Sequence, residues 1–193
     1  MNTRNKLNTL FIIIVSIAFA LACSSGGGDQ MAEANKRVDE ANKKIGEVND
    51  LITKTEAQNQ ILFGANIQTV AQLNYYKDRM RGTAKDIVDS YEKANTTLKE
   101  VSKIFDDASR LNVTDKYKEY VKLKSDEFAK RAEAADIRKG NAQAFIEIDS
   151  PRTMVQKFED NNDKFGKKVK EADDIAEKAK KIETENKDLF KTT

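Results

Sequence analysis

The sequence contains no histidine and no tryptophan, and it has only one cysteine, one proline and eight glycines among its 193 residues. Histidine is the commonest general base and a common metal ligand, so its absence removes most of the usual catalytic and metal-binding designs. A single cysteine forms neither an internal disulfide nor a thiolate zinc cluster. The phosphate-binding, nucleophile-elbow and zinc-protease motifs are also missing. We therefore expect no catalytic residue, no cofactor, no metal ion and no enzyme activity.

An excess of charge of one sign is missing as well. Lysine and arginine number 34 and the acidic residues number 32, so the formal net charge is only +2 although 34% of the residues are charged. A strongly basic balance is typical of nucleic-acid-binding proteins. The near cancellation predicts no nucleic-acid partner and a surface on which both signs are mixed.

The first 22 residues differ from the rest of the chain. A short polar segment with Arg4 and Lys6 precedes a thirteen-residue apolar run, Leu10 to Ala22, in which Ser16 is the one polar residue. This pattern is typical of a secretory signal peptide, and the apolar run is too short to cross about 30 Å of hydrocarbon comfortably as a helix. We expect residues 1–22 to be a signal peptide that is removed. Without Arg4 and Lys6, 32 cations face 32 anions.

The apolar run ends at Cys23, the only cysteine. These residues resemble a bacterial lipoprotein signal, in which small and aliphatic residues lead to a cysteine. The resemblance implies that Cys23 is the lipid attachment site, that it becomes acylated, and that the signal is cut before it. Ala20 stands where that family usually carries leucine. Ala20-Leu21-Ala22 also fits the site of ordinary signal peptidase, which would leave Cys23 without lipid.

A spacer of small and polar residues follows the cysteine. Residues 24–30 read SSGGGDQ, and as a flexible coil they span on the order of 15 Å. We expect residues 23–30 to form a lipidated cysteine with its tether, and residues 31–193 to form one folded domain.

Seven-residue units begin at Met31. With Met31 at heptad position a, Met31, Val38, Ile45, Ile52 and Asn59 occupy a, and Ala34, Ala41, Val48, Thr55 and Leu62 occupy d. Sustained heptads predict a helix that packs at a shallow angle, as in coiled coils and bundles. Thr55 and Asn59 are polar at these positions, which either fixes the register of packing or marks the end of the pattern near Gly64.

A second heptad register follows Gly64 and predicts a helix within residues 65–111, with Gly82 as a point where it could bend. Its a positions are Val70, Lys77, Ala84, Tyr91, Leu98 and Phe105, and its d positions are Leu73, Met80, Ile87, Ala94, Val101 and Ala108.

Two further helices are expected. Thr114 is a candidate N-cap for a helix that ends near Gly140, with Tyr117, Val121, Phe128, Ala132 and Ala135 on one face. Residues 142–148 fit either a short helix or an extended segment. Ser150 and Pro151 form a start signal for a last helix that reaches about Phe190.

These patterns predict an all-α fold, an elongated antiparallel bundle of three or four long helices with heptad packing. No segment alternates for long enough to build a sheet. In the competing arrangement the first helix pairs with another copy or another protein through the 31–62 heptads, so self-association belongs among the expectations.

One segment has the composition of an interaction surface. Tyr75, Tyr76, Arg79 and Arg81 combine aromatic rings with cations, which are enriched in protein interfaces. The simpler interpretation is a helix with an ordinary basic outer face. The lysines between 167 and 181 suggest a sulfated polysaccharide partner, but acidic residues interleave with them and favour a solvated face.

An acylated cysteine, a glycine-serine tether and a charged helical body together resemble small surface lipoproteins of spirochaetes and other double-membrane bacteria. The resemblance implies a lipid-anchored protein of the cell outer membrane, displayed outward to bind host or matrix components. The alternative is a periplasmic structural or assembly lipoprotein. It resembles the murein lipoprotein, although Lys191 is not the last residue here.

Overall fold

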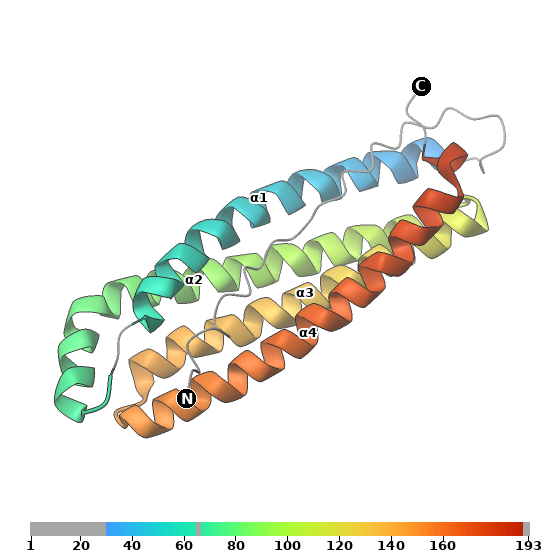
Figure 1. The fold of residues 1–193 in the computed structure, drawn as a ribbon. Helices are drawn as coiled ribbons and strands as arrows, with labels where there is room; N and C mark the ends of the chain where they lie inside the picture. Colours follow the sequence, from blue (N-terminus) through green and yellow to red (C-terminus); the bar gives the residue numbers. More distant parts are fainter. Residues whose placement is uncertain (1–29, 65–66, 191–193) are drawn as a thin grey trace.

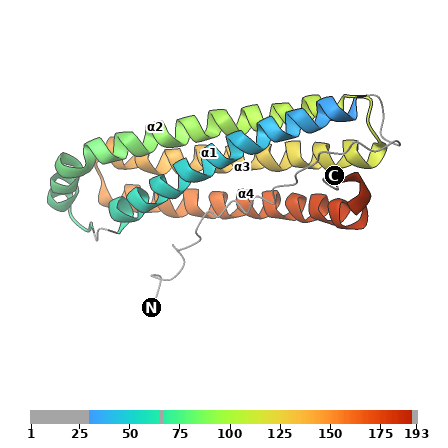
Figure 2. The ribbon, with the colours of Figure 1, turned by 90° about the horizontal axis from the view of Figure 1, so that it is seen from above.

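The computed structural model describes residues 30–64 and 67–190 of the chain. These residues form four long α-helices and no β-strand, and a short 3-10 helix, Lys187–Leu189, follows the last of them. The helices run side by side, up and down along one long axis (Figures 1 and 2). The predicted all-α antiparallel bundle is confirmed, with four helices. They are α1 (Met31–Phe63), α2 (Val70–Ser109), α3 (Asp115–Glu147) and α4 (Pro151–Glu185).

Each helix packs chiefly against its neighbours in the chain. The helix α2 lies between α1 and α3, and α3 in turn contacts α4. Figures 1 and 2 both show α1 beside α2, and α4 beside α3. The short connections between consecutive helices produce this antiparallel order.

The heptad positions predicted from the sequence form the core. All ten a and d residues between Met31 and Leu62 are buried within the chain. A second copy would therefore have to displace α1 to use them. In the second register every a and d residue is buried except Val70 and Met80. The buried face predicted for the third helix is also confirmed, because all five of its residues are at most 2% exposed.

Side-chain caps fix where three of the helices begin. The Thr114 and Ser150 hydroxyls accept hydrogen bonds from backbone N–H groups of the first turns that follow them, as the sequence predicted. At α2 the Thr69 hydroxyl accepts from the Gln72 N–H at 3.2 Å, and the Gln72 side chain accepts from the Thr69 N–H at 3.1 Å. This capping box starts α2 at Val70, five residues after the predicted limit.

The predicted helix end near Gly140 is wrong, because α3 continues to Glu147. Glycine alone costs a helix only about 1 kcal/mol, which packing against a neighbouring helix outweighs. At Gly140 a Cβ atom would lie 3.4 Å from Nδ2 of Asn161 on α4, so the two helices approach closely there. Most of the ambiguous stretch 142–148 is helical. The chain becomes extended at Ile148, shortly before Pro151 starts α4.

The first turns of α2 bend away from the line of the remaining helix (Figures 1 and 2). Gly82 is the only glycine of α2, and nothing lies within 4 Å of the position that its Cβ would take. A residue of low helix propensity in an open position is consistent with the predicted bend.

The chain enters and leaves the bundle at the same end. Beside the turn between α2 and α3, the Gln30 side chain accepts a hydrogen bond from the Asn112 N–H at 2.8 Å. Near the other terminus, the Phe190 ring lies 4.8 Å from that of Tyr120, centroid to centroid. The whole described core lies between Met31 and Ile182, so the body after residue 30 carries the core it needs to fold by itself.

Candidate interaction surface

The segment singled out in the sequence lies on the first turns of α2. Tyr75 is 51% exposed, and the guanidinium carbon of Arg79 lies 4.5 Å from the centroid of its ring. Arg81 is exposed as well. Tyr76 is half-buried and packs against the core. Three of the four predicted residues are therefore available to a partner, while the fourth mainly completes the core.

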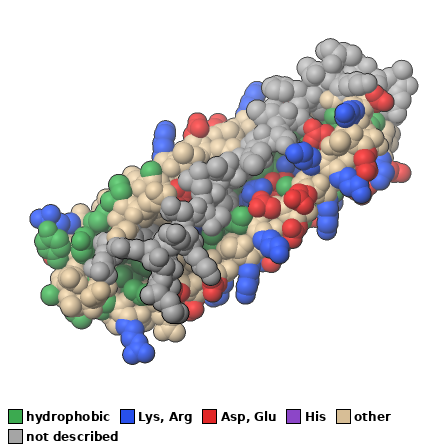
Figure 3. All heavy atoms as spheres, viewed as in Figure 1, with side chains coloured by type: hydrophobic (Ala, Val, Ile, Leu, Met, Phe, Trp, Pro, Cys, Tyr) green, Lys and Arg blue, Asp and Glu red, His purple; other side chains and the backbone are tan. Residues whose placement is uncertain are grey.

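The same end of the bundle holds the exposed large hydrophobic side chains. Among the residues that the structure describes there are four, and all lie where α1 ends and where α2 and α4 begin. Figure 3 shows hydrophobic side chains gathered at this end beside a few Lys and Arg side chains, whereas Lys, Arg, Asp and Glu are frequent along the lower flank. Exposed patches of this kind commonly mark interaction sites. The four are Ile61, Val70, Tyr75 and Val155.

The sequence that forms much of this end lacks charged residues. Residues 57–76 are twenty consecutive residues without a single Asp, Glu, Lys or Arg, although the whole chain is 34% charged. The run joins the end of α1 to the start of α2, and it contains three of the four exposed hydrophobic residues. Three amide side chains at the same end, Gln60, Asn74 and Gln156, are exposed. We call the four hydrophobic residues and these three amides the uncharged end surface.

A shallow hollow adjoins this surface. It lies between the connection from α1 to α2 and the first turns of α4. The lining of the hollow includes one cation and one anion, so the hollow has no net charge. Its lining residues are Ile67, Gln68, Pro151, Arg152, Val155, Gln156 and Glu159.

An ion pair between a buried lysine and an exposed aspartate holds the start of α2 in place. Lys77 is only 6% exposed, and its Nζ lies 2.8 Å from Oδ1 of Asp149 in the connection between α3 and α4. The hydrogen bond and the positive charge of Lys77, together with the charge of Arg81, hold the pKa of the Asp149 carboxyl below its usual value. This pair ties the first turns of α2 to the end of α3.

Further inside, a polar cluster joins all four helices. The Tyr91 hydroxyl of α2 donates a hydrogen bond to the Glu56 carboxylate of α1. Arg138 of α3 lies with its Nε 3.4 Å from the same carboxylate and donates to Oδ1 of Asn162 at 2.8 Å. Burial, and then the Glu56 charge, raise the pKa of Tyr91 far above its usual value, which keeps the phenol protonated as a donor.

The cluster continues between α3 and α4, where the Asn161 side chain donates to Oδ1 of Asn141 at 2.8 Å. Its members mainly bond to one another. The Nε atom of Arg138 has no hydrogen-bond partner, but it lies 3.4 Å from the Glu56 carboxylate as part of an ion pair. We interpret the role of the cluster as setting the register in which the helices pack, since buried polar groups favour one register over others.

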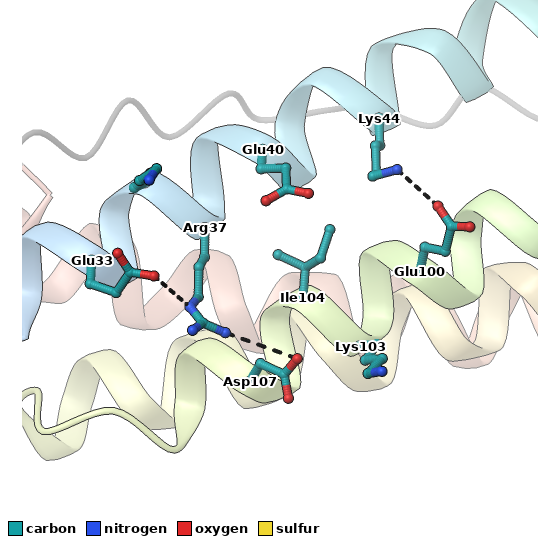
Figure 4. A pocket seen from close by; sticks show the side chains of 9 residues that line it. Glu33, Arg37, Glu40, Lys44, Glu100, Lys103, Ile104 and Asp107 are labelled. Atoms are coloured by element: carbon teal, nitrogen blue, oxygen red, sulfur yellow. Dashed lines mark hydrogen bonds and ion pairs between the residues drawn. The ribbon is translucent and has the colours of Figure 1, made fainter.

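A charged groove runs between α1 and α2, nearer the end where the chain enters (Figure 4). Arg37 lies 3.1 Å from Glu33 and 3.9 Å from Asp107, and Lys44 lies 2.8 Å from Glu100. The hydrogen bond to Glu100 raises the pKa of Lys44. The lining has equal numbers of cations and anions around Ile104, so these charges mainly pair with one another. The charged residues of the lining are Glu33, Lys36, Arg37, Glu40, Lys44, Glu100, Lys103 and Asp107.

Among the described residues, no group of three or more Cys, Asp or Glu side chains is placed to hold a metal ion. In residues 30–64 and 67–190, no helix has both the length and the apolar character that crossing a membrane requires. The predicted lipid site Cys23 and the signal peptide lie outside the described residues. No protein-family model matches the chain, and neither a curated protein nor a solved structure does.

Proposed function

We propose that the chain is a lipid-anchored, non-enzymatic protein of the bacterial cell envelope. Acyl chains on Cys23 hold it in the outer membrane, and its helical body is displayed at the surface to bind host or matrix components. The observation that carries this proposal is the thirteen-residue apolar run that ends at the only cysteine, followed by a tether of small residues. Two or three acyl chains on one residue hold a protein firmly in a bilayer.

The arrangement of the body supports this proposal. The tether joins the bundle at Gln30, beside the turn between α2 and α3. Ile61 lies 31 residues further along the chain, about 46 Å away at 1.5 Å per residue. An anchor at Cys23 would therefore leave this end of the bundle, with the Tyr75–Arg79 pair, remote from the membrane and accessible from outside the cell.

Lipidation is tested with radiolabelled palmitate and membrane fractionation of cells that express the full chain. We expect label and membrane association in the native chain and the loss of both in Cys23→Ser. Mass spectrometry of the mature protein should find Cys23 as the acylated first residue. An unmodified Cys23 at the mature N-terminus contradicts the proposed anchor.

Surface display needs a separate test, because an inward-facing lipoprotein would carry the same lipid. Protease added to intact cells should remove the helical body, while a periplasmic marker protein stays whole. Complete protection of the body would reject the surface role. It would favour the periplasmic structural or assembly lipoprotein, which the heptad-packed helices also fit.

A further inference from the structure

The uncharged end surface has a composition that the folding of one chain does not require. Ile61, Val70 and Tyr75 are 67%, 54% and 51% exposed, so they contribute little to the core. They lie in the twenty-residue run without charge, in a chain whose other surfaces are covered with Lys, Asp and Glu. Depletion of charged residues together with exposed apolar and aromatic side chains is characteristic of the centre of a protein interface.

The chemistry of this surface is complementary to itself. An amide side chain carries both donors and an acceptor, so Gln60, Asn74 and Gln156 can pair with the same residues of another copy. Apolar side chains are likewise matched by apolar side chains. A contact related by a two-fold axis places the same patch on both sides, and like charges in the patch would then oppose one another. The absence of charge from residues 57–76 removes that repulsion.

The charged residues around the surface have both signs. Asp78 is next to Arg79 on α2, and Arg152 and Glu159 stand on the same hollow. Such a rim suits a second copy, whose rim offers the same mixture, better than it suits a strongly acidic or basic ligand. From these observations we infer that the uncharged end surface is the docking site for a second copy of this chain.

This dimer does not depend on the lipid anchor, and it is compatible with one. A two-fold axis along the length of the bundles leaves both Gln30 ends pointing in the same direction, so two anchored copies can dimerise on one membrane. The contact is small, and we expect a dissociation constant in the micromolar to millimolar range. Confinement to a membrane raises the effective concentration and favours such a contact.

The test is sedimentation velocity of the body, residues 30–193, which contains the whole described core. We expect a monomer–dimer equilibrium that shifts toward dimer as the concentration approaches about 1 mM. Replacing two exposed apolar residues by acids, in the double variant Ile61→Glu and Val155→Glu, should weaken dimerisation at least tenfold. The matched control Thr96→Glu adds an acid at an exposed site of α2, about 39 Å along the helix from Val70, and should dimerise like the parent.

Cross-linking locates the contact independently. The body lacks cysteine, so Ala71→Cys introduces one exposed thiol at this end and Thr96→Cys introduces one on the flank. Under mild oxidation we expect a disulfide-linked dimer from the first variant in large excess over the second. Circular dichroism of every variant should match the parent.

Three results overturn the inference: a body that stays monomeric near 1 mM, a dimer that the double acidic variant leaves intact, or equal weakening by Thr96→Glu. Because this body lacks Cys23, none of these results bears on the proposed anchor.

Discussion

The guanidinium of Arg138 stacks on the ring of Phe165, with its central carbon 3.9 Å from the ring centroid. The contact joins α3 to α4, and the Nε atom of Arg138 also lies 3.4 Å from the Glu56 carboxylate of α1. One cation thus connects three helices. Arg138 and Glu56 are each only 8% exposed, so either charge would be costly without the other.

Arg138→Met should therefore destabilise the bundle. The substitution keeps an apolar stem beside Phe165 but leaves the Glu56 carboxylate buried without its cation. We expect a loss of about 3 to 5 kcal/mol in the free energy of unfolding, measured by urea denaturation at pH 7. The double variant Arg138→Met with Glu56→Gln should recover part of this loss. A loss below about 1 kcal/mol in the single variant contradicts the role given to this pair.

Lys77→Met should not destabilise the bundle, although Lys77 is about as buried as Arg138. Its partner Asp149 is 89% exposed at the side chain, so water solvates the carboxylate once the lysine is gone. Methionine also suits a heptad a position better than a cation does. We expect the free energy of unfolding to stay the same or to rise by about 1 kcal/mol.

A second measurement checks the electrostatic half of that prediction. The pKa of Asp149 is lowered mainly by Lys77, so NMR titration of Lys77→Met should find it moved upward toward the usual value of an aspartate. A large loss of stability would mean that Lys77 stabilises the fold more than the geometry indicates. An unchanged Asp149 pKa would mean that Lys77 does not lower it and that the ion pair is weaker than the 2.8 Å distance indicates.

The apolar core could be predicted from the sequence because heptads are local. Spacings of three and four residues place side chains on one helix face wherever the partner lies, so Val38, Ile45 and Leu98 could be assigned to the core without knowing the packing. Gly140 was misjudged for the opposite reason. Whether a glycine ends a helix depends on what lies beside it, and Asn161 of α4 is not adjacent in the sequence.

The polar cluster had no such local signal. Glu56, Tyr91, Arg138 and Asn162 are separated by 24 to 47 residues, and each resembles many other residues of a highly charged chain. Only the tertiary packing selects them. The uncharged end surface was different, since the run from 57 to 76 is visible in the sequence. A search for gaps in the charge pattern, in addition to clusters of charge, would have found it.

Gly166→Ala should stabilise the bundle. Gly166 lies inside α4, and nothing lies within 4 Å of the position of an added Cβ. Alanine restricts the unfolded chain more than glycine, which is worth about 0.5 to 1 kcal/mol in a helix interior. A melting temperature about 2 to 4 °C higher is expected by circular dichroism.

Gly46→Ala is the matched variant in α1, where the site is equally open, and it should give a similar gain. Gly140→Ala should gain less because its Cβ approaches Asn161. Equal gains at Gly140 and Gly166 would show that α3 and α4 approach less closely than the structure indicates.

Alkaline pH should weaken the bundle through its buried tyrosines. Burial raises the pKa values of Tyr117 and Tyr120 well above the usual 10.0. The folded chain then keeps these protons at pH values where the unfolded chain releases them, so the free energy of unfolding falls as pH rises above about 10. Below that pH both states are protonated, and the stabilisation is fully present.

Tyr120→Phe isolates this effect. The Tyr120 hydroxyl makes no hydrogen bond to residues that the structure describes, and its ring packs at 4.8 Å from that of Phe190, a contact that phenylalanine preserves. We expect the variant to match the parent within about 1 kcal/mol at pH 7. Urea denaturation at a series of pH values should then show a smaller loss of stability for the variant between pH 10 and 11.5. Lysines also titrate in this range, but they are the same in both proteins and cancel in the comparison. Parallel curves for the two proteins would mean that Tyr120 ionises as readily in the folded chain as in the unfolded one, and that this end of the bundle admits water.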